Sequence, residues 1–568
     1  MGKAQKTGSA LICEALENLG VRHVFGLPGS QNYLLYESLR HSSIETILPT
    51  SELAAAFMAN GYYRASGKVG VIITIPGPGF TYAVTGIAEA YLDSAAILCL
   101  VGKPAESPGR KFQLQAIEQK AMAKPVVKAY YCIDDGEQLQ STLFEAYESA
   151  KSGEPGPVLV EVDNALLSQA FTGVEAVQGQ KRPTRGAKNQ NAVQQAFDLI
   201  SQSIRPVLFV GQGASEASDQ VLELAELLSA PVLSTTSGRG ILSEEHRLSF
   251  PFNFVKGGGE TMNQLLDASD LVVVLGCKFS HNGSGGFQYR FASEKLIHVD
   301  ASENVLEANY QAKLAIRSDV GEFLDSLLLY LKNESGKADN RWSKEDLDAW
   351  RDSAKSECSE EDIEPRVVGM RPGRAFEFFK TLGEFVPADS HLVTDSGLHQ
   401  FLVRKYCTVL RSRGLIIPSD FQSMGFGLPA AIGAKLAVPD RTVVAIIGDG
   451  SLAMTAMEFA TAIREKIPIK VILFSDGHLG LIRFRQMSHF GSTHAVDLHQ
   501  PDYEKLASGL GSDYFRFEGD IRAVLRDFFK SPCVAMLEVR LKDSQAMKKM
   551  RAKSLLREFL GRIGVGSG

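Results

Sequence analysis

Short apolar runs alternate with segments of helical spacing through the first third of the chain. The runs are "HVFGLPG", "ETILP", "VGVIITIPGPG", "AAILCLVG" and "GPVLVEVD". Strands that alternate with helices predict a parallel sheet with helices on both faces. The polar stretch "FTGVEAVQGQKRPTRGAKNQN" that follows predicts a linker. We therefore expect a first domain over residues 1–172.

The same alternation occurs twice more along the chain. The second section carries "RPVLFVGQGA", "APVLSTTSG", "DLVVVLGCKF" and "KLIHVDAS"; the third carries "HLVTDSG", "GLIIPSD", "RTVVAIIGDG", "IKVILFSDG" and "CVAMLEVRL". A charged stretch between them predicts part helix and part linker. The pattern predicts an α/β protein of three doubly wound parallel-sheet domains, with the second domain over 190–335 and the third over 366–545.

The last residues, 546–568, contain a basic amphipathic helical pattern, "MKKMRAKSLLREFLGRIG". Such a helix can bind a membrane surface, but docking on its own protein is favoured. The beginning of the chain also has the pattern of an amphipathic helix, with acids in it, rather than that of a signal peptide. No apolar run reaches the length that spans a membrane.

Charge and cysteine usage narrow the class of protein. The 568 residues carry a net charge of −6 with both signs interspersed, which argues against nucleic acid as the main partner. The seven cysteines are scattered, mostly in apolar segments, and form no CxxC pair. Free, mostly buried thiols in a reducing compartment are the simplest interpretation. We expect a cytoplasmic protein.

Two acids follow neighbouring strands of the third section. Asp449 lies between Gly448 and Gly450 at the end of one strand, and Asp476 follows the next strand, "IKVILF". A right-handed βαβ unit puts both acids at the sheet edge where parallel α/β proteins bind ligands. A helix opening at Ser451 would point free N–H groups there, which suits phosphate, and two acids beside phosphate imply Mg²⁺. On spacing alone, a turn residue and a helix cap remain an equal alternative.

Glu52 begins a predicted helix with an apolar face in "PTSELAAAFMANGYYRASGKVGVIIT". Taken alone, an acid there interacts with the helix dipole. Together with "TIPGPGFTYAVTGIAEAYLDS" and "SMGFGLPAAIGAKLAVPDRTVVAIIGDGS", however, this segment resembles the thiamine diphosphate-dependent enzymes of the acetolactate synthase, pyruvate oxidase and 2-oxo acid decarboxylase type. The likeness covers nearly the whole chain. It implies three domains in the order pyrimidine-binding, central Rossmann-like and diphosphate-binding.

The resemblance implies thiamine diphosphate and Mg²⁺ as cofactors. The coenzyme supplies a carbanion that attacks a carbonyl group, and it takes up the electrons released on decarboxylation. By this resemblance Glu52 contacts the aminopyrimidine, and Met424 wedges beneath the bent coenzyme. Asp449, Asp476 and the backbone carbonyl of His478 hold the metal, and the His478 side chain stays free for substrate.

Further residues are expected around the coenzyme by the same resemblance. Gln115, or its neighbour Gln113, and His399 are candidates for catalysis. The expected cofactor-binding set is the turn at Pro28 with Gly29, Glu52, Pro76, Ser396, Gly397, Leu398, His399, Gln422, Met424, Gly448, Asp449, Gly450, Ser451, Asp476, His478, Leu479 and Gly480. Glu52 and the metal meet across two subunits in these enzymes, so a homodimer or homotetramer is implied.

Several positions depart from the pattern of these enzymes. Asp476 stands where Asn is usual, Ser51 replaces a frequent histidine, and Leu398 stands where acetolactate synthases usually have Gln. "LGLIRFRQ" lacks the tryptophan of many acetolactate synthases, and "CKFSHNGSG" replaces the Arg-Phe-Asp-Asp-Arg-like run of flavin-binding members. We expect metal still to bind, whereas FAD and a standard biosynthetic acetolactate synthase are disfavoured.

The sequence as a whole predicts a transferase or lyase that acts on C–C bonds. We expect it to decarboxylate a pyruvate-like 2-oxo acid and to ligate the acyl carbanion to a second carbonyl. A decarboxylase or lyase without ligation, and a non-catalytic regulatory or assembly subunit, are the alternatives.

Smaller motifs favour structural interpretations. "VGQGAS" favours a plain turn over a dinucleotide site, and "GYYRASGKV" favours a helix end over a phosphate loop. His281 and His489, taken singly, are expected to be surface or satisfied histidines.

Overall fold

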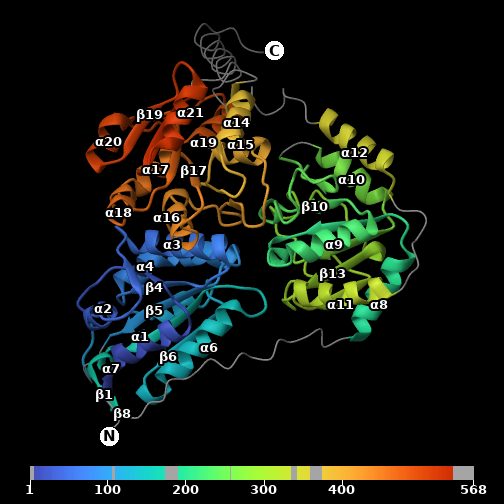
Figure 1. Cartoon of the computed structure of the whole chain (residues 1–568). Coiled ribbons are helices and arrows are strands. Elements are labelled where there is room, and N and C mark those ends of the chain that lie inside the picture. The colour runs from blue at the N-terminus through green and yellow to red at the C-terminus, as the bar shows by residue number, and fades with distance from the viewer. Residues whose placement is uncertain are drawn as a thin grey trace, which may run out of the picture.

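The described part of the chain contains three six-stranded parallel sheets, each flanked by helices (Figure 1). The computed structural model describes residues 5–104, 109–172, 190–255, 258–333, 342–357 and 374–541. The predicted fold class is confirmed. The predicted helical tail and most of the predicted linker after Phe171 lie outside the described residues.

The first sheet has the strand order β3-β2-β4-β5-β7-β6. Its inner strands are continuous apolar runs because helices cover both faces. The strands are β2 (His23–Gly26), β3 (Glu45–Ile47), β4 (Gly70–Thr74), β5 (Ile97–Lys103), β6 (Ala129–Ile133) and β7 (Val158–Asp163). The helices are α1 (Gly8–Asn18), α2 (Tyr33–Leu39), α3 (Glu52–Ser66), α4 (Pro78–Leu92), α5 (Gln119–Ala123), α6 (Leu139–Lys151) and α7 (Asn164–Ser168). A small antiparallel ribbon of β1 (Gln5–Thr7) and β8 (Ala170–Thr172) joins the two ends of this section.

The second sheet has the order β11-β10-β9-β12-β13-β14. Its strand order reverses between β9 and β12, the place where open α/β sheets bind ligands. The strands are β9 (Pro206–Val210), β10 (Val232–Ser234), β11 (Ser249–Phe250), β12 (Leu271–Leu275), β13 (Leu296–Asp300) and β14 (Leu314–Arg317). The helices are α8 (Gln190–Gln202), α9 (Ser218–Leu228), α10 (Gly259–Ala268), α11 (Val320–Asn333) and α12 (Lys344–Glu357).

The third sheet repeats the strand order of the first, as β16-β15-β17-β18-β20-β19. The strands are β15 (His391–Thr394), β16 (Leu415–Ile416), β17 (Val443–Gly448), β18 (Lys470–Ser475), β19 (Asp513–Arg516) and β20 (Ala535–Arg540). The helices are α14 (Arg374–Phe385), α15 (Leu398–Tyr406), α16 (Gly427–Ala437), α17 (Asp449–Thr455), α18 (Glu458–Arg464), α19 (Gly480–Phe490), α20 (Tyr503–Leu510) and α21 (Ile521–Lys530).

Two local predictions meet different outcomes. The helix end predicted in "GYYRASGKV" is confirmed, since α3 ends at Ser66 and is capped by Gly67 with φ of +73°. The single helix predicted to open at Ser451 is wrong. The structure has α17, which begins at Asp449, and a separate α18, which begins at Glu458.

The first and third domains pack together through α3 and α16 (Figure 1). These helices approach closely because glycines face backbone across the contact. A Cβ on Gly61 would overlap the carbonyl of Ala430, and a Cβ on Gly433 would overlap the carbonyl of Met58. Within the described part of the chain, no helix is long and apolar enough to cross a membrane.

The described cysteines are free thiols, as predicted, but they are not all buried. Cys132 and Cys533 are exposed, and the buried ones are Cys13, Cys99, Cys277 and Cys407. Cys358 lies outside the described residues.

Candidate functional site

Asp449 and Asp476 meet at one edge of the third sheet. Strands β17 and β18 are parallel neighbours, so their carboxyl ends deliver both acids to the same place. A carboxylate oxygen of Asp449 accepts hydrogen bonds from the backbone N–H of Asp476 at 3.1 Å and of Gly477 at 2.8 Å. The other oxygen accepts from the N–H of Gly450 at 2.9 Å. The two acids lie together, as the strand spacing predicts.

This pair of acids has the chemistry of a divalent-cation site. Burial and the negative charge of Asp449 together raise the pKa of Asp476 to about 6. Two carboxylates and the nearby carbonyl of His478 are hard oxygen donors, which fit Mg²⁺. Among the described residues, no group of three or more His, Cys, Asp or Glu side chains forms a metal site by itself. A metal here would therefore take further oxygens from a ligand such as a diphosphate.

The His478 side chain corrects one expectation. It is not free, because its Nδ1 lies 2.9 Å from a carboxylate oxygen of Asp497. An antiparallel bridge between these two residues sets them side by side. The amide of Gln500 also donates to Asp449, at 2.7 Å. Asp497 and Gln500 were missed because they lie in an irregular loop without strand, helix or motif signals.

A turn between β15 and α15 lies beside the acids. The His399 ring lies over its glycine, since a Cβ on Gly397 would lie 2.8 Å from Cε1 of the ring, and a Cβ on Gly448 would lie 3.0 Å from Nδ1. Burial lowers the pKa of His399 to about 4, so the ring is neutral at pH 7. Its buried Nε2 has no hydrogen-bond partner within the described chain. A neutral ring nitrogen without a partner leaves one hydrogen bond open to a bound ligand.

The segment from Ile417 to Gly425, which we call the strap, joins β16 to α16. Asp395, at the end of β15, accepts hydrogen bonds from the N–H of Gly425 at 3.1 Å and of Gly427 at 2.6 Å. These bonds hold Met424 over the Asp449 turn, where its Cε lies 3.1 Å from the position of a Cβ on Gly450. Sequence reasoning missed Asp395, although it is a strand-end acid of the same kind as Asp449.

The remaining predicted residues of the third domain belong to the same cluster. Cδ1 of Leu398 lies 2.9 Å from the position of a Cβ on Gly480. The Ser451 hydroxyl lies 3.5 Å from the carbonyl of Ser396. Leu479 also lies against Gly450, and the Ser396 hydroxyl contacts the Gln422 amide oxygen at 3.3 Å.

Glu52 is the first residue of α3, at the carboxyl edge of the first sheet. A Cβ on Gly79 would lie 3.0 Å from Oε1 of Glu52. Ser51 caps the helix, with its hydroxyl accepting from the N–H of Ala54 at 3.2 Å. The serine that replaces a frequent histidine therefore has a structural task here.

Gln115 and the other predicted residues of the first domain lie at the same edge. The backbone oxygen of Gln115 lies 2.8 Å from the position of a Cβ on Gly77, next to Pro76. The amide oxygen of Gln115 is buried and has no partner among the residues described. The turn at Pro28 reaches this edge through Gly29, where a Cβ would lie 2.8 Å from Ile75.

The predicted residues thus form two clusters, one in the first domain and one in the third. The contacts described for Glu52 come from its own domain, and the hydrogen bonds described for Asp449 come from the third domain. His281 and His489 belong to neither cluster and are exposed, as predicted.

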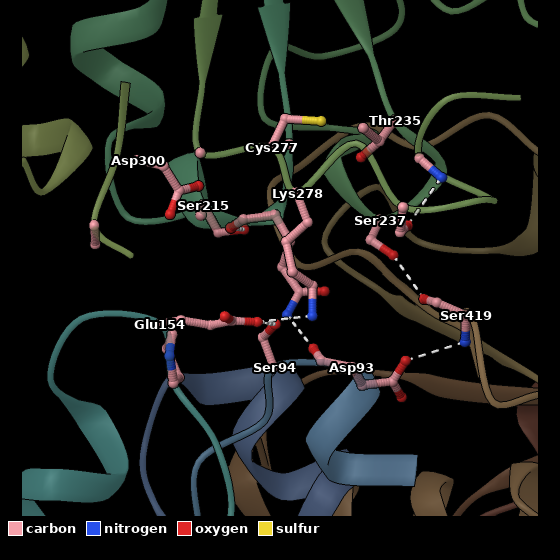
Figure 2. A pocket seen from close by; sticks show the side chains of 18 of the residues that line it. Asp93, Ser94, Glu154, Ser215, Thr235, Ser237, Cys277, Lys278, Asp300 and Ser419 are labelled. Atoms are coloured by element: carbon pink, nitrogen blue, oxygen red, sulfur yellow. Dashed lines mark hydrogen bonds and ion pairs between the residues drawn. The ribbon is translucent and has the colours of Figure 1, made fainter. Parts of the chain in front are cut away.

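A separate cavity of about 400 Å³ lies where the three domains meet (Figure 2). Lys278, which follows β12, crosses it to the first domain. Its Nζ donates to the carbonyl of Leu92 at 3.0 Å and pairs with Glu154 at 2.7 Å. On the same, first-domain side of the cavity, Asp93 accepts from the N–H of Ser419 in the strap at 3.0 Å (Figure 2). Burial raises the pKa of Asp300, at the end of β13, to about 6.

The "VGQGAS" turn forms part of the wall of this cavity. It is a short 3₁₀ turn, Gln212–Ala214, and Gly211 and Gly213 line the space. The turn itself is as predicted, but its place at a cavity was not.

Models of one family match all three domains of the chain. The N-terminal TPP binding domain of thiamine pyrophosphate enzymes matches residues 6–122, the central domain matches 193–327, and the C-terminal TPP binding domain matches 395–539. The three matches follow one another in the order that the sequence resemblance implies.

Curated relatives match the chain along nearly its full length. It is 30% identical to acetolactate synthase isozyme 1 large subunit of Escherichia coli, over 96% of this chain and 95% of the relative. It is 30% identical to the chloroplastic acetolactate synthase 1 of Nicotiana tabacum, over 94% and 81% respectively. It is 29% identical to the acetolactate synthase large subunit of Porphyra purpurea, over 95% and 93%. The chain belongs to the thiamine pyrophosphate enzyme family.

Proposed function

We propose that this enzyme uses thiamine diphosphate and Mg²⁺ to decarboxylate a pyruvate-like 2-oxo acid and to join the acyl group to a second carbonyl. The observation that carries the proposal is the meeting of Asp449 and Asp476 under a strap that presents Met424. The names of its relatives, acetolactate synthases, support this reaction class.

The third domain supplies the groups that bind the charged end of the coenzyme. Asp449, Asp476 and the carbonyl of His478 would hold Mg²⁺. The turn Ser396–His399 and the glycine-flanked start of α17 bind the diphosphate, because free backbone N–H groups at helix starts favour anions. The neutral His399 ring lies against the two glycines of this diphosphate site, Gly397 and Gly448.

Glu52 moves the proton that activates the coenzyme. Its carboxyl group would bond the aminopyrimidine nitrogen and hold a proton there, and the bound coenzyme would supply the carbanion chemistry. Met424 would pack against the coenzyme from the strap. Gln115, beside Gly77, is proposed to contact the substrate from the same side.

A second copy of the chain completes the site. Large apolar side chains are exposed beside both clusters: Tyr33 is 59% and Tyr82 65% exposed in the first domain, and Met454 is 59% and Met457 55% exposed near Asp449. A monomer rarely leaves such residues in water next to a functional site. We propose a homodimer, or a homotetramer built from it, in which Glu52 of one copy faces Asp449 of the other.

We propose that the cavity between the three domains does not bind FAD. Lys278 forms an ion pair with Glu154 and donates a hydrogen bond to a backbone carbonyl of the first domain. Its ammonium group is therefore not directed at a flavin. Absorbance of the purified protein at the flavin bands tests this directly: no such absorbance is expected, and a stoichiometric flavin spectrum would overturn it.

The reaction is tested by screening. The purified protein is incubated with thiamine diphosphate, Mg²⁺ and a panel of 2-oxo acids, with and without acceptor carbonyls, and CO₂ release is measured. We expect release that depends on the coenzyme, and an acyloin or acetohydroxy acid as product. An aldehyde product would show that the enzyme decarboxylates its donor without ligating the acyl group to an acceptor. Absence of turnover with every donor would favour the non-catalytic alternative.

A further inference from the structure

We propose that Glu89, on α4 of the first domain, and Asp93, the residue directly after α4, are positioning residues that hold the strap and thereby fix Met424 over the Asp449 turn. The task of Met424 rests on the proposed function, whereas the contact between α4 and the strap does not. Both acids lie outside the two clusters of candidate site residues.

Each of the two acids accepts a hydrogen bond from a backbone N–H group of the strap. Glu89 accepts a hydrogen bond from the N–H of Ser423 at 2.8 Å, and Asp93 accepts one from the N–H of Ser419 at 3.0 Å. They are four residues apart, and because Asp93 keeps a right-handed helical conformation as the C-cap of α4, both lie on one face of that helix. Ser423 directly precedes Met424, so the bond to Glu89 fixes the backbone beside the wedge.

Asp93 is itself held rigidly by α3. Its second oxygen pairs with Arg64 at 3.0 Å and accepts from the Asn60 amide at 3.3 Å. Arg64 also donates to the carbonyl of Ile417, the first residue of the strap. Three hydrogen bonds thus run from the first domain to the strap backbone, at its beginning, its middle and its end.

The strap is clamped on its other side by the third domain. Asp395 binds the N–H of Gly425 and of Gly427. Between the bonds to Ser419 and Ser423, Gln422 has φ of +62°, a conformation that costs free energy in a residue with a side chain. A segment that holds such a conformation needs surrounding contacts, and removal of one clamp should release it.

A purely structural role would make Glu89 one of several contacts between the two domains. Glu458 is the matched comparison, because it is a buried acid of the third domain that accepts from the N–H of Thr50 in the first domain at 3.0 Å. It bridges the same pair of domains without a described hydrogen bond to the strap.

The test uses the full-length protein with Glu89→Ala, Glu89→Gln and Glu458→Ala. Hydrogen exchange of the strap amides is measured without coenzyme, and thiamine diphosphate binding is measured by calorimetry with Mg²⁺. Loss of one buried hydrogen bond of about 1.4 kcal/mol corresponds to about tenfold faster exchange. We expect that acceleration in Glu89→Ala, together with weaker coenzyme binding. Glu89→Gln keeps an accepting oxygen and should behave like the wild type.

The outcomes separate this proposal from the proposed function. Strap exchange in Glu89→Ala equal to that of the wild type, or an equal acceleration in Glu458→Ala, would overturn the positioning role. If Glu89→Ala does not fold, Glu89→Asp shortens the side chain and is measured in the same way, with the same expected acceleration. If the strap responds as expected while the wild type turns over no 2-oxo acid, the proposed reaction fails and the positioning role stands.

Discussion

Asp476 places a negative charge at a position where the sequence resemblance implies a neutral asparagine. The carboxylate lies beside Asp449, and burial already disfavours two charges there. We expect Asp476→Asn to retain coenzyme-dependent turnover, because an amide oxygen also ligates Mg²⁺, but to need more Mg²⁺ because the attraction is weaker. Turnover titrated with Mg²⁺, Mn²⁺ and Ca²⁺ measures both effects. Complete loss of coenzyme binding would mean that the carboxylate has another task.

Glu89 should make the protein less stable as the pH rises. Burial and the charge of Asp93 raise its pKa to about 8, against the lowering effects of the Ser423 hydrogen bonds and of Arg64. An acid whose pKa is raised on folding contributes stability that is complete below about pH 4.5 and is lost as the pH rises towards about 8. The slope for one such group is about 1.4 kcal/mol per pH unit.

Glu89→Gln removes this dependence. Thermal unfolding followed by calorimetry at pH 5, 6, 7 and 8 should show the variant gaining stability relative to the wild type at each step. A constant difference between the two proteins across this range would contradict the raised pKa.

Single residues could be predicted from the sequence where a strand end or a familiar motif marks them. Asp449 and Asp476 follow apolar strands, so their meeting could be foreseen. Glu89 and Asp93 could not, because their partners are backbone N–H groups more than 300 positions later in the chain. The pairing of His478 with Asp497 could likewise not be predicted, because an irregular loop brings the aspartate back to the site.

At the scale of elements, the strands of the three large sheets that sequence patterns missed share one property; the small ribbon of β1 and β8 was missed as well. Strands β6, β11, β14 and β19 all lie at the edges of their sheets. An edge strand has a neighbour on one side only, so it needs no long, fully apolar run. Strands β6, β14 and β19 are accordingly only partly buried. Strands β4, β5 and β12 are almost wholly buried, and their apolar runs predict them from the sequence.

The contact between α3 and α16 depends on glycines that leave room for backbone. We expect Gly61→Ala and Gly433→Ala each to lower the thermal midpoint, because the added methyl meets a carbonyl oxygen that cannot move, with a typical cost of about 1–3 kcal/mol. Gly383→Ala, in α14, is the control. Nothing lies within 4 Å of its added methyl, so the better helix propensity of alanine should raise stability by about 0.5–1 kcal/mol. Equal effects at all three positions would refute the packing argument.

At the scale of the whole molecule, the first and third sheets share one strand order, and their carboxyl edges carry the two proposed halves of the site. The proposed dimer can be tested by complementation. Glu52→Gln and Asp449→Ala should each be inactive alone. A co-expressed heterodimer, purified through one tag on each chain, has one site with both mutations and one site with neither, so it should show about half the wild-type activity. An inactive heterodimer would mean that Glu52 and Asp449 of one chain belong to the same site.

The central claim is that Glu52 is the acid that activates the coenzyme, and Glu52→Gln tests it most directly. The measurement is CO₂ release from the best 2-oxo acid donor, beside calorimetric binding of thiamine diphosphate to the same preparation. General acid–base catalysis contributes about 10²–10⁴-fold, so turnover should fall by that factor while the coenzyme still binds. A variant that binds the coenzyme and retains wild-type turnover would contradict the account.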